Sequence, residues 1–383
     1  MSIRSAKRLE AFPEYIFSRL VKAIAEVEKT SRRKVLNLGM GTPDVPPSKK
    51  YLAKIAQLID AADAHLYPGY GTSPEFREAL RAWYKIRFGV ELAADELFPL
   101  LGAKDGTGHL PLALLDEGDE ILIPNPGYPG FSGPVAMVGA ISVFYDLSEK
   151  NNFKIDLAEL ERLVTPKTKG IWVNFPSNPT GQVATLEELR SIVAFAQKHD
   201  IFILYDNAYA EITFGGYKAP SILEIEGAKE VAIELGSFSK TFSFAGFRMG
   251  WIVGNQKIVE ALAKVKSQTD SGMWLALQRL GAYALSNPDE EWTEKMLHTY
   301  ETRRDIIAKH IKTLGLTFRV PQGGLYLWAK IPASAKNSET FCMSLLKEKH
   351  IVLTPGTAFG TNSERYVRVS ICVNVEKIGE YFN

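Results

Sequence analysis

Cysteine is almost absent from this chain of 383 residues, which contains only Cys342 and Cys372. Two cysteines cannot build a disulfide framework or a thiolate metal cage, and we expect both to be packed as small apolar residues. This usage is typical of a reducing compartment, so the sequence predicts a cytoplasmic protein. It predicts no metal site.

An excess of charge of either sign is also missing. Lys and Arg together number 45 and Asp and Glu 44, which leaves a net charge of +1. Such a balance provides no field that would attract nucleic acid or an anionic membrane. No apolar stretch approaches the length needed to cross a bilayer, and the start MSIRSAKRLEAFPEYIF lacks the apolar segment of a signal peptide. We therefore expect a protein that acts on small molecules.

Short apolar runs alternate with helical patterns between about residues 50 and 270. The runs are FPLL near 98, ILIP at 121, ISVFY at 141, GIWVN at 170, IFILY at 201, VAIELG at 231 and GWIVG at 250. This alternation predicts an α/β protein with a mainly parallel sheet covered by helices. One such helix, LEELRSIVAFAQKHD, follows Thr185, which is expected to be its N-cap.

The rest of the chain has a different pattern. A long helical region from about 275 is broken at Asn287-Pro288 and is followed by the strand-like stretches FRVPQGGLYLWAKI and YVRVSICV. The N-terminal forty residues include the turn-rich segment LNLGMGTPDVPP, which we expect to pack on this second part. The predicted division is therefore a large domain of residues 46–274 and a small domain of residues 1–45 and 275–383.

The run SFSKTFSFAGFRMG, from Ser237 to Gly250, carries the strongest chemical signal. It places Lys240 among hydroxyl groups and Arg248 eight residues later. A partly desolvated lysine among small residues has a free amine that can attack a carbonyl and form a Schiff base, whereas a lone lysine among serines is usually solvated. Ser237 and Arg248 suit a phosphate, and Gly246 and Gly250 allow close backbone approach.

This run resembles the pyridoxal-phosphate lysine signature of class I and II aminotransferases, S-x-S-K-x7-R. The resemblance extends from about residue 10 to residue 375 and implies the fold type I architecture, in which a large domain with a mainly parallel seven-stranded sheet joins a small α/β domain. It also implies a homodimer and a role in amino-acid metabolism or biosynthesis. Several stretches are most similar to LL-diaminopimelate aminotransferases and related alanine and aspartate aminotransferases.

The resemblance implies roles for four residues around the cofactor ring. A buried carboxylate keeps the pyridine nitrogen protonated, and Asp206 in YDNAYAE is the candidate. Tyr209 and Asn178, the latter in FPSNPTG, match residues that hydrogen-bond the phenolic oxygen, and Tyr128 in NPGYPGF matches an aromatic that stacks on the ring. Taken singly, Asn178 and Tyr128 are more typical of turns and Asp206 of a helix cap, and it is the company of the lysine motif that favours the cofactor roles.

The cofactor phosphate is expected at the start of a helix. GAKDGTGH, residues 102–109, follows a strand, and the N–H groups of Ala103 and Lys104 are candidates to hold the phosphate. Relatives often have a serine at the place of Ala103, so one hydroxyl contact is absent here. Tyr67 in LYPGYGTSPEFREAL resembles the tyrosine that reaches the phosphate of the partner subunit, with Tyr70 as its rival.

The substrate carboxylate is expected on an arginine, whose donor fork matches it. Arg368 in RYVRVSICV matches the family's carboxylate arginine, and Gly41 in LGMGTPD and Asn178 match residues that line the same group. Arg365 is the alternative, but alternation along a strand puts it on the opposite face from Arg368, where we expect solvent.

The activity implied is ping-pong transamination from an L-amino acid to a 2-oxo acid such as 2-oxoglutarate, with Lys240 moving the α-proton. A carbon–sulfur β-lyase that uses the same lysine and arginine is the alternative. Diaminopimelate-type relatives often carry a glutamate in the loop after the tyrosine matched by Tyr67, where this chain has Gly69-Tyr70-Gly71. The amino donor therefore stays open.

Overall fold

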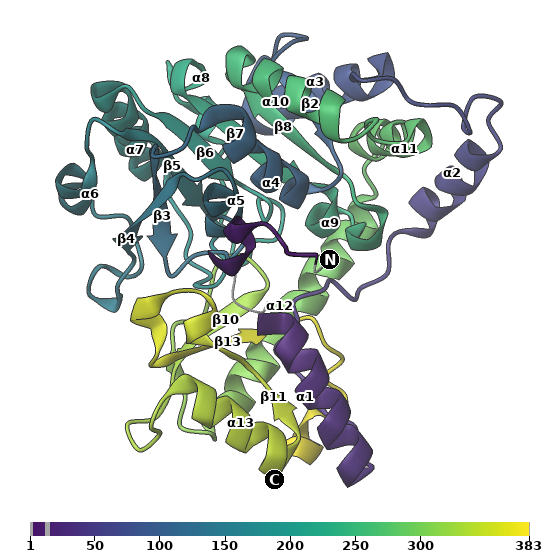
Figure 1. The fold of residues 1–383 in the computed structure, drawn as a ribbon. Helices are drawn as coiled ribbons and strands as arrows, with labels where there is room; N and C mark the ends of the chain where they lie inside the picture. The colour runs from purple at the N-terminus through teal and green to yellow at the C-terminus, as the bar shows by residue number, and fades with distance from the viewer. Residues whose placement is uncertain (1–2, 12–15, 383) are drawn as a thin grey trace.

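A computed structural model describes residues 3–11 and 16–382 of the chain. Its largest feature is a seven-stranded sheet with the order β2-β8-β7-β6-β5-β3-β4 (Figure 1). The strands are β2 (Leu97–Leu100), β3 (Glu120–Asn125), β4 (Ile141–Asp146), β5 (Thr168–Asn174), β6 (Phe202–Asp206), β7 (Ala232–Ser237) and β8 (Gly250–Gly254). Neighbours from β4 to β7 pair in parallel, and β8 is antiparallel to both β7 and β2. All seven predicted runs form this sheet.

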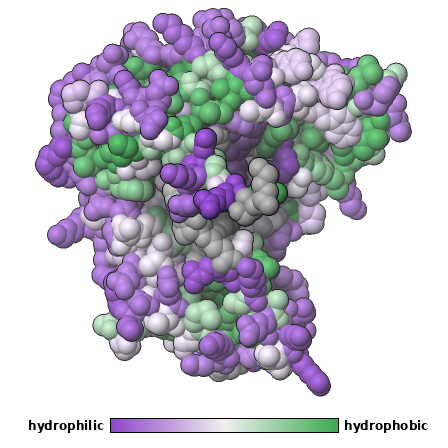
Figure 2. All heavy atoms as spheres, viewed as in Figure 1, coloured by the Kyte–Doolittle hydropathy of each residue, from purple (hydrophilic) through white to green (hydrophobic). Residues whose placement is uncertain are grey.

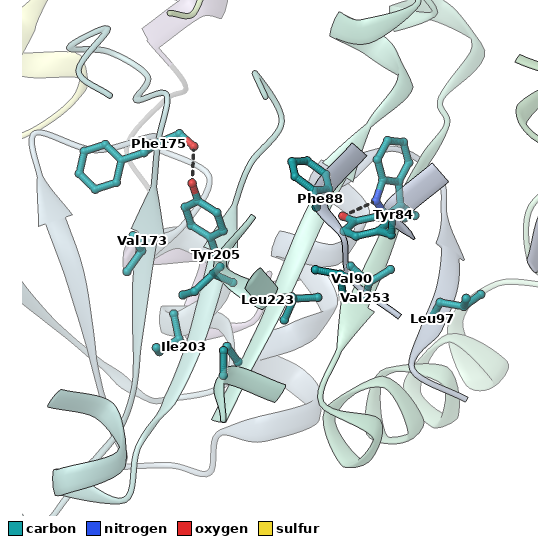
Figure 3. Packing of buried hydrophobic residues seen from close by; sticks show 14 of the residues in the cluster. Tyr84, Phe88, Val90, Leu97, Val173, Phe175, Ile203, Tyr205, Leu223 and Val253 are labelled. Carbon is teal, nitrogen blue, oxygen red and sulfur yellow. Dashed lines mark hydrogen bonds between the residues drawn. The ribbon is translucent and has the colours of Figure 1, made fainter. Parts of the chain in front are cut away.

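Helices cover both faces of the sheet and bury its inner strands on both sides. One face packs on α4 (Ala103–Leu114), α5 (Ser132–Met137) and α10 (Gln256–Thr269). The other packs on α2 (Lys49–Ile59), α3 (Pro74–Phe88), α6 (Leu157–Leu163), α7 (Leu186–His199), α8 (Ala228–Val231) and α11 (Leu275–Ser286). Figure 3 shows the second core, where the Tyr205 hydroxyl donates to the carbonyl oxygen of Phe175 at 2.9 Å.

The predicted N-cap of α7 is confirmed. The hydroxyl of Thr185 accepts from the backbone N–H of Glu188, and the Glu188 carboxylate accepts from the N–H of Thr185, which together form a capping box. These two bonds satisfy N–H groups that the first turn of a helix otherwise leaves unpaired.

The second unit combines both ends of the chain. Its four-stranded sheet has the order β12-β13-β10-β9, with β9 (Thr317–Phe318), β10 (Tyr326–Lys330), β12 (Thr354–Pro355) and β13 (Tyr366–Ser370). A separate parallel pair joins β1 (Leu36–Asn37) to β11 (Ile351–Val352). The helices of this unit are α1 (Ile16–Ser31), α12 (Glu290–Lys312) and α13 (Ser338–Lys349), seen in the lower half of Figure 1.

Helix α11 bears on where the two units divide. Its buried residues, among them Leu280 and Leu285, belong to the core that contains Phe76 of α3 and the sheet strands. We keep a two-domain division as a proposal and place its second break near Asn287, after α11, rather than at residue 275. The break between α11 and α12 lies at the predicted Asn287-Pro288.

The surface mixes chemical character. On the face in Figure 2, hydrophobic groups in green are interrupted by hydrophilic groups in purple. Within residues 3–11 and 16–382, none of the helices has both the length and the apolar character of a membrane span.

Candidate active site

A cavity of about 350 Å³ lies beyond the carboxyl ends of β5, β6 and β7. Its walls come from these strand ends, from the segment after β1 and from β10 and β13. Every predicted site residue except Tyr67 lines it, and these are Gly41, Ala103, Lys104, Tyr128, Asn178, Asp206, Tyr209, Ser237, Lys240, Arg248 and Arg368. This is the edge where open α/β sheets bind ligands.

Lys240 enters the cavity from α9 (Phe238–Thr241), a short helix that begins where β7 ends. The Ser237 hydroxyl caps α9 by accepting from the backbone N–H of Ser239 at 3.2 Å. The lysine Nζ donates to the carbonyl oxygen of Gly41 at 3.5 Å and lies 5.6 Å from the ring centroid of Tyr209. Its amine is therefore held between the two units of the fold.

Asp206 is the last residue of β6 and is buried. Burial raises the pKa of its carboxyl from the ordinary 3.8 to about 6, while the N–H of Ala208 and the charge of Lys240 act in the opposite direction. Ala208 N–H is 3.2 Å from Oδ1. A carboxylate placed this way is matched to a cationic ligand that would compensate its charge.

Arg368 is buried on β13 and faces the same cavity. It donates from Nη1 to Asn178 Oδ1 and from Nη2 to the carbonyl oxygen of Gly39, each at 2.9 Å. Its guanidinium stacks between two rings, 4.1 Å from the centroid of Tyr326 and 4.6 Å from that of Phe359. These contacts fix the orientation of the donor fork.

The expectation for Arg365 was wrong in part. It precedes β13 and is half-buried, not solvated. Its guanidinium donates to the carbonyl oxygens of Ala335 at 2.5 Å and Pro332 at 2.7 Å, because the loop after β10 folds over it. Arg365 does not line the cavity, which leaves Arg368 as the arginine of the two that does.

Tyr326 is a cavity residue that the sequence did not reveal. Its hydroxyl accepts from the Tyr209 hydroxyl at 3.3 Å and donates to the carbonyl oxygen of Gly41 at 3.5 Å. A Cβ on Gly41 would lie 2.0 Å from the hydroxyl oxygen of Tyr326, so position 41 has room only for glycine. Pairing of Trp328 with Arg368 across β10 and β13 puts Tyr326 on the face of Arg368, and that register was the missing signal.

The opposite end of the cavity suits an anion. Helix α4 begins at Ala103, and Gly102 before it has φ +86°. Arg248 approaches this turn so closely that a Cβ on Gly102 would be 2.5 Å from its Nη2. A Cβ on Gly250 would lie 2.7 Å from the backbone nitrogen of Ala103, which confirms the predicted close approach there.

Gly246 differs from this expectation. Apart from its own turn and chain neighbours, no described heavy atom lies within 4 Å of the position its Cβ would take, so its small size serves no close approach by another segment. Arg248 is exposed in the single chain and donates to the carbonyl oxygens of Ala245 and Leu101 at 2.9 and 3.4 Å.

The remaining predicted residues are aromatic. Tyr128 lies in the turn after β3, and its ring packs edge-on against Phe131 at 5.5 Å. Tyr67 and Tyr70 lie outside the cavity on the segment between α2 and α3, which reaches away from the body at the right of Figure 1. They are 88% and 64% exposed, so a second chain could cover either of them.

This donor set fits pyridoxal phosphate. An amine, a carboxylate and an arginine fork that matches a carboxylate converge on one cavity, and the N-terminus of α4 with a second arginine lies at its far end. The glycines at 102 and 250 leave the backbone of α4 accessible where a side chain would collide.

The family model for aminotransferase class I and II matches residues 33–382. The chain belongs to this family. The prediction of a pyridoxal-phosphate-dependent transaminase is thereby confirmed, and the β-lyase alternative is not favoured.

Curated relatives match this aminotransferase over nearly its whole length. The LL-diaminopimelate aminotransferase of Dehalococcoides mccartyi strain CBDB1 is 38% identical over 98% of this chain and 96% of the relative. The enzyme of the same name from Aquifex aeolicus strain VF5 is 38% identical over 97% of this chain and 96% of its own.

Solved structures agree on the fold. The apo-BacF structure from Bacillus subtilis has a TM-score of 0.94 and 36% identity and covers 100% of this aminotransferase and 97% of its own chain. The aspartate aminotransferase from Rhizobium meliloti, at 24% identity, a TM-score of 0.93 and 100% and 97% coverage, shows likeness of fold alone. The fold type I architecture is confirmed.

Proposed function

We propose that this aminotransferase holds pyridoxal phosphate in the cavity beyond β5, β6 and β7, and transfers the amino group of an L-amino acid to a 2-oxo acid such as 2-oxoglutarate. The observation that carries the proposal is the convergence of Lys240, Asp206 and Arg368 on one cavity from three separate elements. No two of these residues are closer than 34 positions in the sequence.

The cofactor supplies an aldehyde that takes up the amino group and a ring that withdraws electrons from the α-carbon. Lys240 Nζ would hold the aldehyde, and its free amine would accept a proton from the substrate α-carbon and return it. Asp206 would hold the ring nitrogen in its protonated form, and Tyr209 and Asn178 would hold the phenolic oxygen. Tyr128 would pack against the ring.

Backbone N–H groups and the remaining side chains bind two anionic groups, the cofactor phosphate and the substrate carboxylate. The N–H groups of Ala103 and Lys104 at the start of α4, together with Ser237 and Arg248, hold the phosphate. Arg368 binds the substrate α-carboxylate through its fork, and its neighbours Asn178 and Gly41 line the same place. In the described structure Arg368 already donates to Asn178, so the two residues are positioned relative to each other before substrate enters.

The amino donor is an L-amino acid whose side chain enters the cavity between the two units. LL-diaminopimelate is the first candidate because several relatives carry that name. Alanine and aspartate are further candidates, since Gly69-Tyr70-Gly71 supplies no carboxylate for a distal amine. Amino-acid biosynthesis is the corresponding role.

A panel of amino donors with 2-oxoglutarate and pyruvate as acceptors tests the reaction. Formation of the new amino acid only when both donor and acceptor are present supports transamination. Release of pyruvate and ammonia from a sulfur-containing amino acid without an acceptor would instead indicate a β-lyase.

Lys240→Ala tests the covalent role. The variant should lose borohydride trapping of the cofactor and nearly all turnover. The exposed Lys264→Ala, on α10, is the control and should behave as wild type. Trapping at the wild-type level in Lys240→Ala would overturn the assignment.

We also propose a homodimer in which Tyr67 of each chain reaches the phosphate end of its partner's cavity, with Tyr70 as the alternative. Support comes from the exposure of Leu66, Tyr67 and Tyr70 on the outward segment and from the exposed Arg248. Light scattering that shows a fully active monomer would refute it.

Cytoplasmic location, proposed from the two free buried cysteines, is tested by cell fractionation.

A further inference from the structure

Four charged or titratable side chains form a cluster between α4 and α10, outside the cavity lining. Lys266 on α10 is 2% exposed, and its Nζ donates to Asp105 Oδ2 at 2.5 Å and to Asp270 Oδ2 at 2.7 Å. The other oxygen of Asp105 is 2.7 Å from Nδ1 of His109. None of these residues has a role in the function proposed above.

Burying the charges of this cluster costs free energy, which the ion pairs among its members offset. A lysine held this deep is stabilised only by well-placed partners, and removing one partner leaves a buried charge behind. Asp105, Asp270 and His109 keep their ligand atoms within 4.8 Å of one another, and the Lys266 ammonium bonds both carboxylates. The lysine therefore supplies the positive charge that these carboxylates need.

Asp105 connects the cluster to the turn that opens α4. Its Oδ2 accepts from the backbone N–H of Leu101 at 2.8 Å, and its own N–H donates to the carbonyl oxygen of Gly102 at 2.9 Å. The carbonyl oxygen of Leu101 accepts from Arg248 Nη2 at 3.4 Å. The turn is thus held on one side by Asp105 and on the other by the arginine proposed for the phosphate.

The position of the turn at residues 101–103 matters because it leads directly into the N-terminus of α4, where the phosphate is proposed to bind. Ala103 offers no hydroxyl, so the contribution of this turn to the phosphate must come from backbone N–H groups at the start of α4. The direction of those N–H groups depends on the path of residues 101–103. A shift of a few tenths of an ångström in the turn changes the geometry of each hydrogen bond that they donate.

We propose that Lys266 and Asp105 are positioning residues for the cofactor phosphate: Lys266 orients the Asp105 carboxylate, and Asp105 holds the turn before α4 so that the N–H groups at the start of that helix and Arg248 meet the phosphate together. The proposal rests on the function proposed above. Neither side chain touches the cofactor, and the effect is transmitted through the turn.

Lys266→Met tests this, because methionine keeps most of the volume and removes the charge. Cofactor-free protein is titrated with pyridoxal phosphate and, separately, with pyridoxal, which has the same aldehyde and ring but no phosphate. We expect the dissociation constant for pyridoxal phosphate to rise about tenfold or more, and that for pyridoxal to stay within about twofold. A purely structural defect would weaken both ligands alike.

Two further variants complete the test. Lys264→Met changes an exposed lysine on the same helix and should leave both constants unchanged. Asp105→Asn keeps an oxygen for Leu101 but loses the charge, and we expect a smaller phosphate-specific loss; it also serves if Lys266→Met does not fold.

Equal losses for the two ligands, or none, in Lys266→Met and Asp105→Asn would overturn the positioning role. Failure of the wild-type protein to bind pyridoxal phosphate at all would overturn the proposed function instead. The two failures are therefore distinguishable.

Discussion

Asp206 and Glu234 are buried carboxyl groups on the neighbouring strands β6 and β7. Burial is the largest effect on both, and it raises the pKa of Asp206 to about 6 and that of Glu234 to about 7. Their surroundings differ sharply. Asp206 lines the cavity. Glu234 does not line the cavity, and on β7 it lies opposite Tyr205 of β6.

The donors around Glu234 come from the protein itself. They are the Tyr84 hydroxyl at 2.8 Å, the Ser221 hydroxyl at 2.6 Å, the Ile222 N–H at 3.1 Å and the Asn207 side chain. Tyr84 in turn accepts from Trp251 Nε1 at 3.0 Å, a bond drawn in Figure 3. Among the described residues Asp206 receives one such bond, from Ala208. A raised pKa alone does not mark a functional carboxyl. What distinguishes Asp206 is that the protein supplies its carboxylate with few hydrogen-bond donors and leaves it facing the cavity.

Replacement of each carboxyl by its amide gives the largest expected difference. Asp206→Asn should slow proton abstraction about a hundredfold or more, as expected if a positioned charge is worth about 3 kcal/mol to the chemical step. Glu234→Gln should keep turnover within about threefold, because its carboxyl faces no substrate. Pre-steady-state kinetics with an α-deuterated donor measures the step. Equal rates for Asp206→Asn and wild type would break the comparison.

The stability of the cofactor-free protein should depend on pH through both groups. A raised pKa means that the folded protein holds a proton that the unfolded chain has released, so the free energy of unfolding falls as pH rises. For Asp206 the fall lies between about pH 4 and 6, and for Glu234 between about 4.5 and 7. Each contributes on the order of 3 kcal/mol.

Denaturant titrations at pH 4 and pH 7 of wild type, Asp206→Asn and Glu234→Gln check this. In the cofactor-free protein, each amide variant should lose the part of the decrease in unfolding free energy between pH 4 and pH 7 that its carboxyl causes. With cofactor bound, the share of Asp206 should vanish because its charge is then paired, while that of Glu234 should persist. If the contribution of Glu234 to this pH dependence disappeared when the cofactor binds, the separation of the two carboxyl groups would be contradicted.

Two arginines, Arg368 and the half-buried Arg365, offer a second form of the comparison. Arg368 faces the cavity, whereas Arg365 donates to loop carbonyl oxygens. Arg368→Lys keeps the charge but loses the fork, so KM for the amino acid should rise about tenfold or more with cofactor affinity preserved. Arg365→Lys is the matched control and should change melting temperature rather than KM. The reverse result would exchange their roles.

Tyr326→Phe is expected to have the smallest effect. It removes a hydroxyl from two contacts of 3.3 and 3.5 Å and keeps the ring under Arg368. Because neutral bonds of this length are weak, kcat/KM should fall about threefold. Steady-state kinetics checks it, with Tyr326→Leu as the variant that also removes the ring. A loss beyond about a hundredfold in Tyr326→Phe would give the hydroxyl a direct part in the chemistry.

The contrast between local and distant partners explains what the sequence could predict. All seven strands of the large sheet were predictable because each is a compact apolar run, and Thr185 was predictable because its capping partner Glu188 is three residues away. The cavity residues that carry a motif, such as Lys240 and Arg248, were found in the same way.

Tyr326 and Lys266 were not predictable because their partners are set by tertiary packing. Lys266 meets Asp105 across 161 positions, and a lysine on a helix normally indicates solvent. The role of Tyr326 depends on the register between β10 and β13. Gly246 shows the converse: its place in a motif suggested a close approach that the fold does not make.

The pairing of β1 with β11 has a consequence for the order in which the protein is made. Thr354 donates from its hydroxyl to the carbonyl oxygen of Gly39, 315 positions earlier. At a synthesis rate of about 5–20 residues per second, the segment before Gly41 waits roughly 15–60 s on the ribosome for its partner. All the strands of the large sheet, residues 97–254, are synthesised within that interval. The half of the cavity that contains Lys240 can therefore take shape on a nascent chain before the half that contains Arg368 exists.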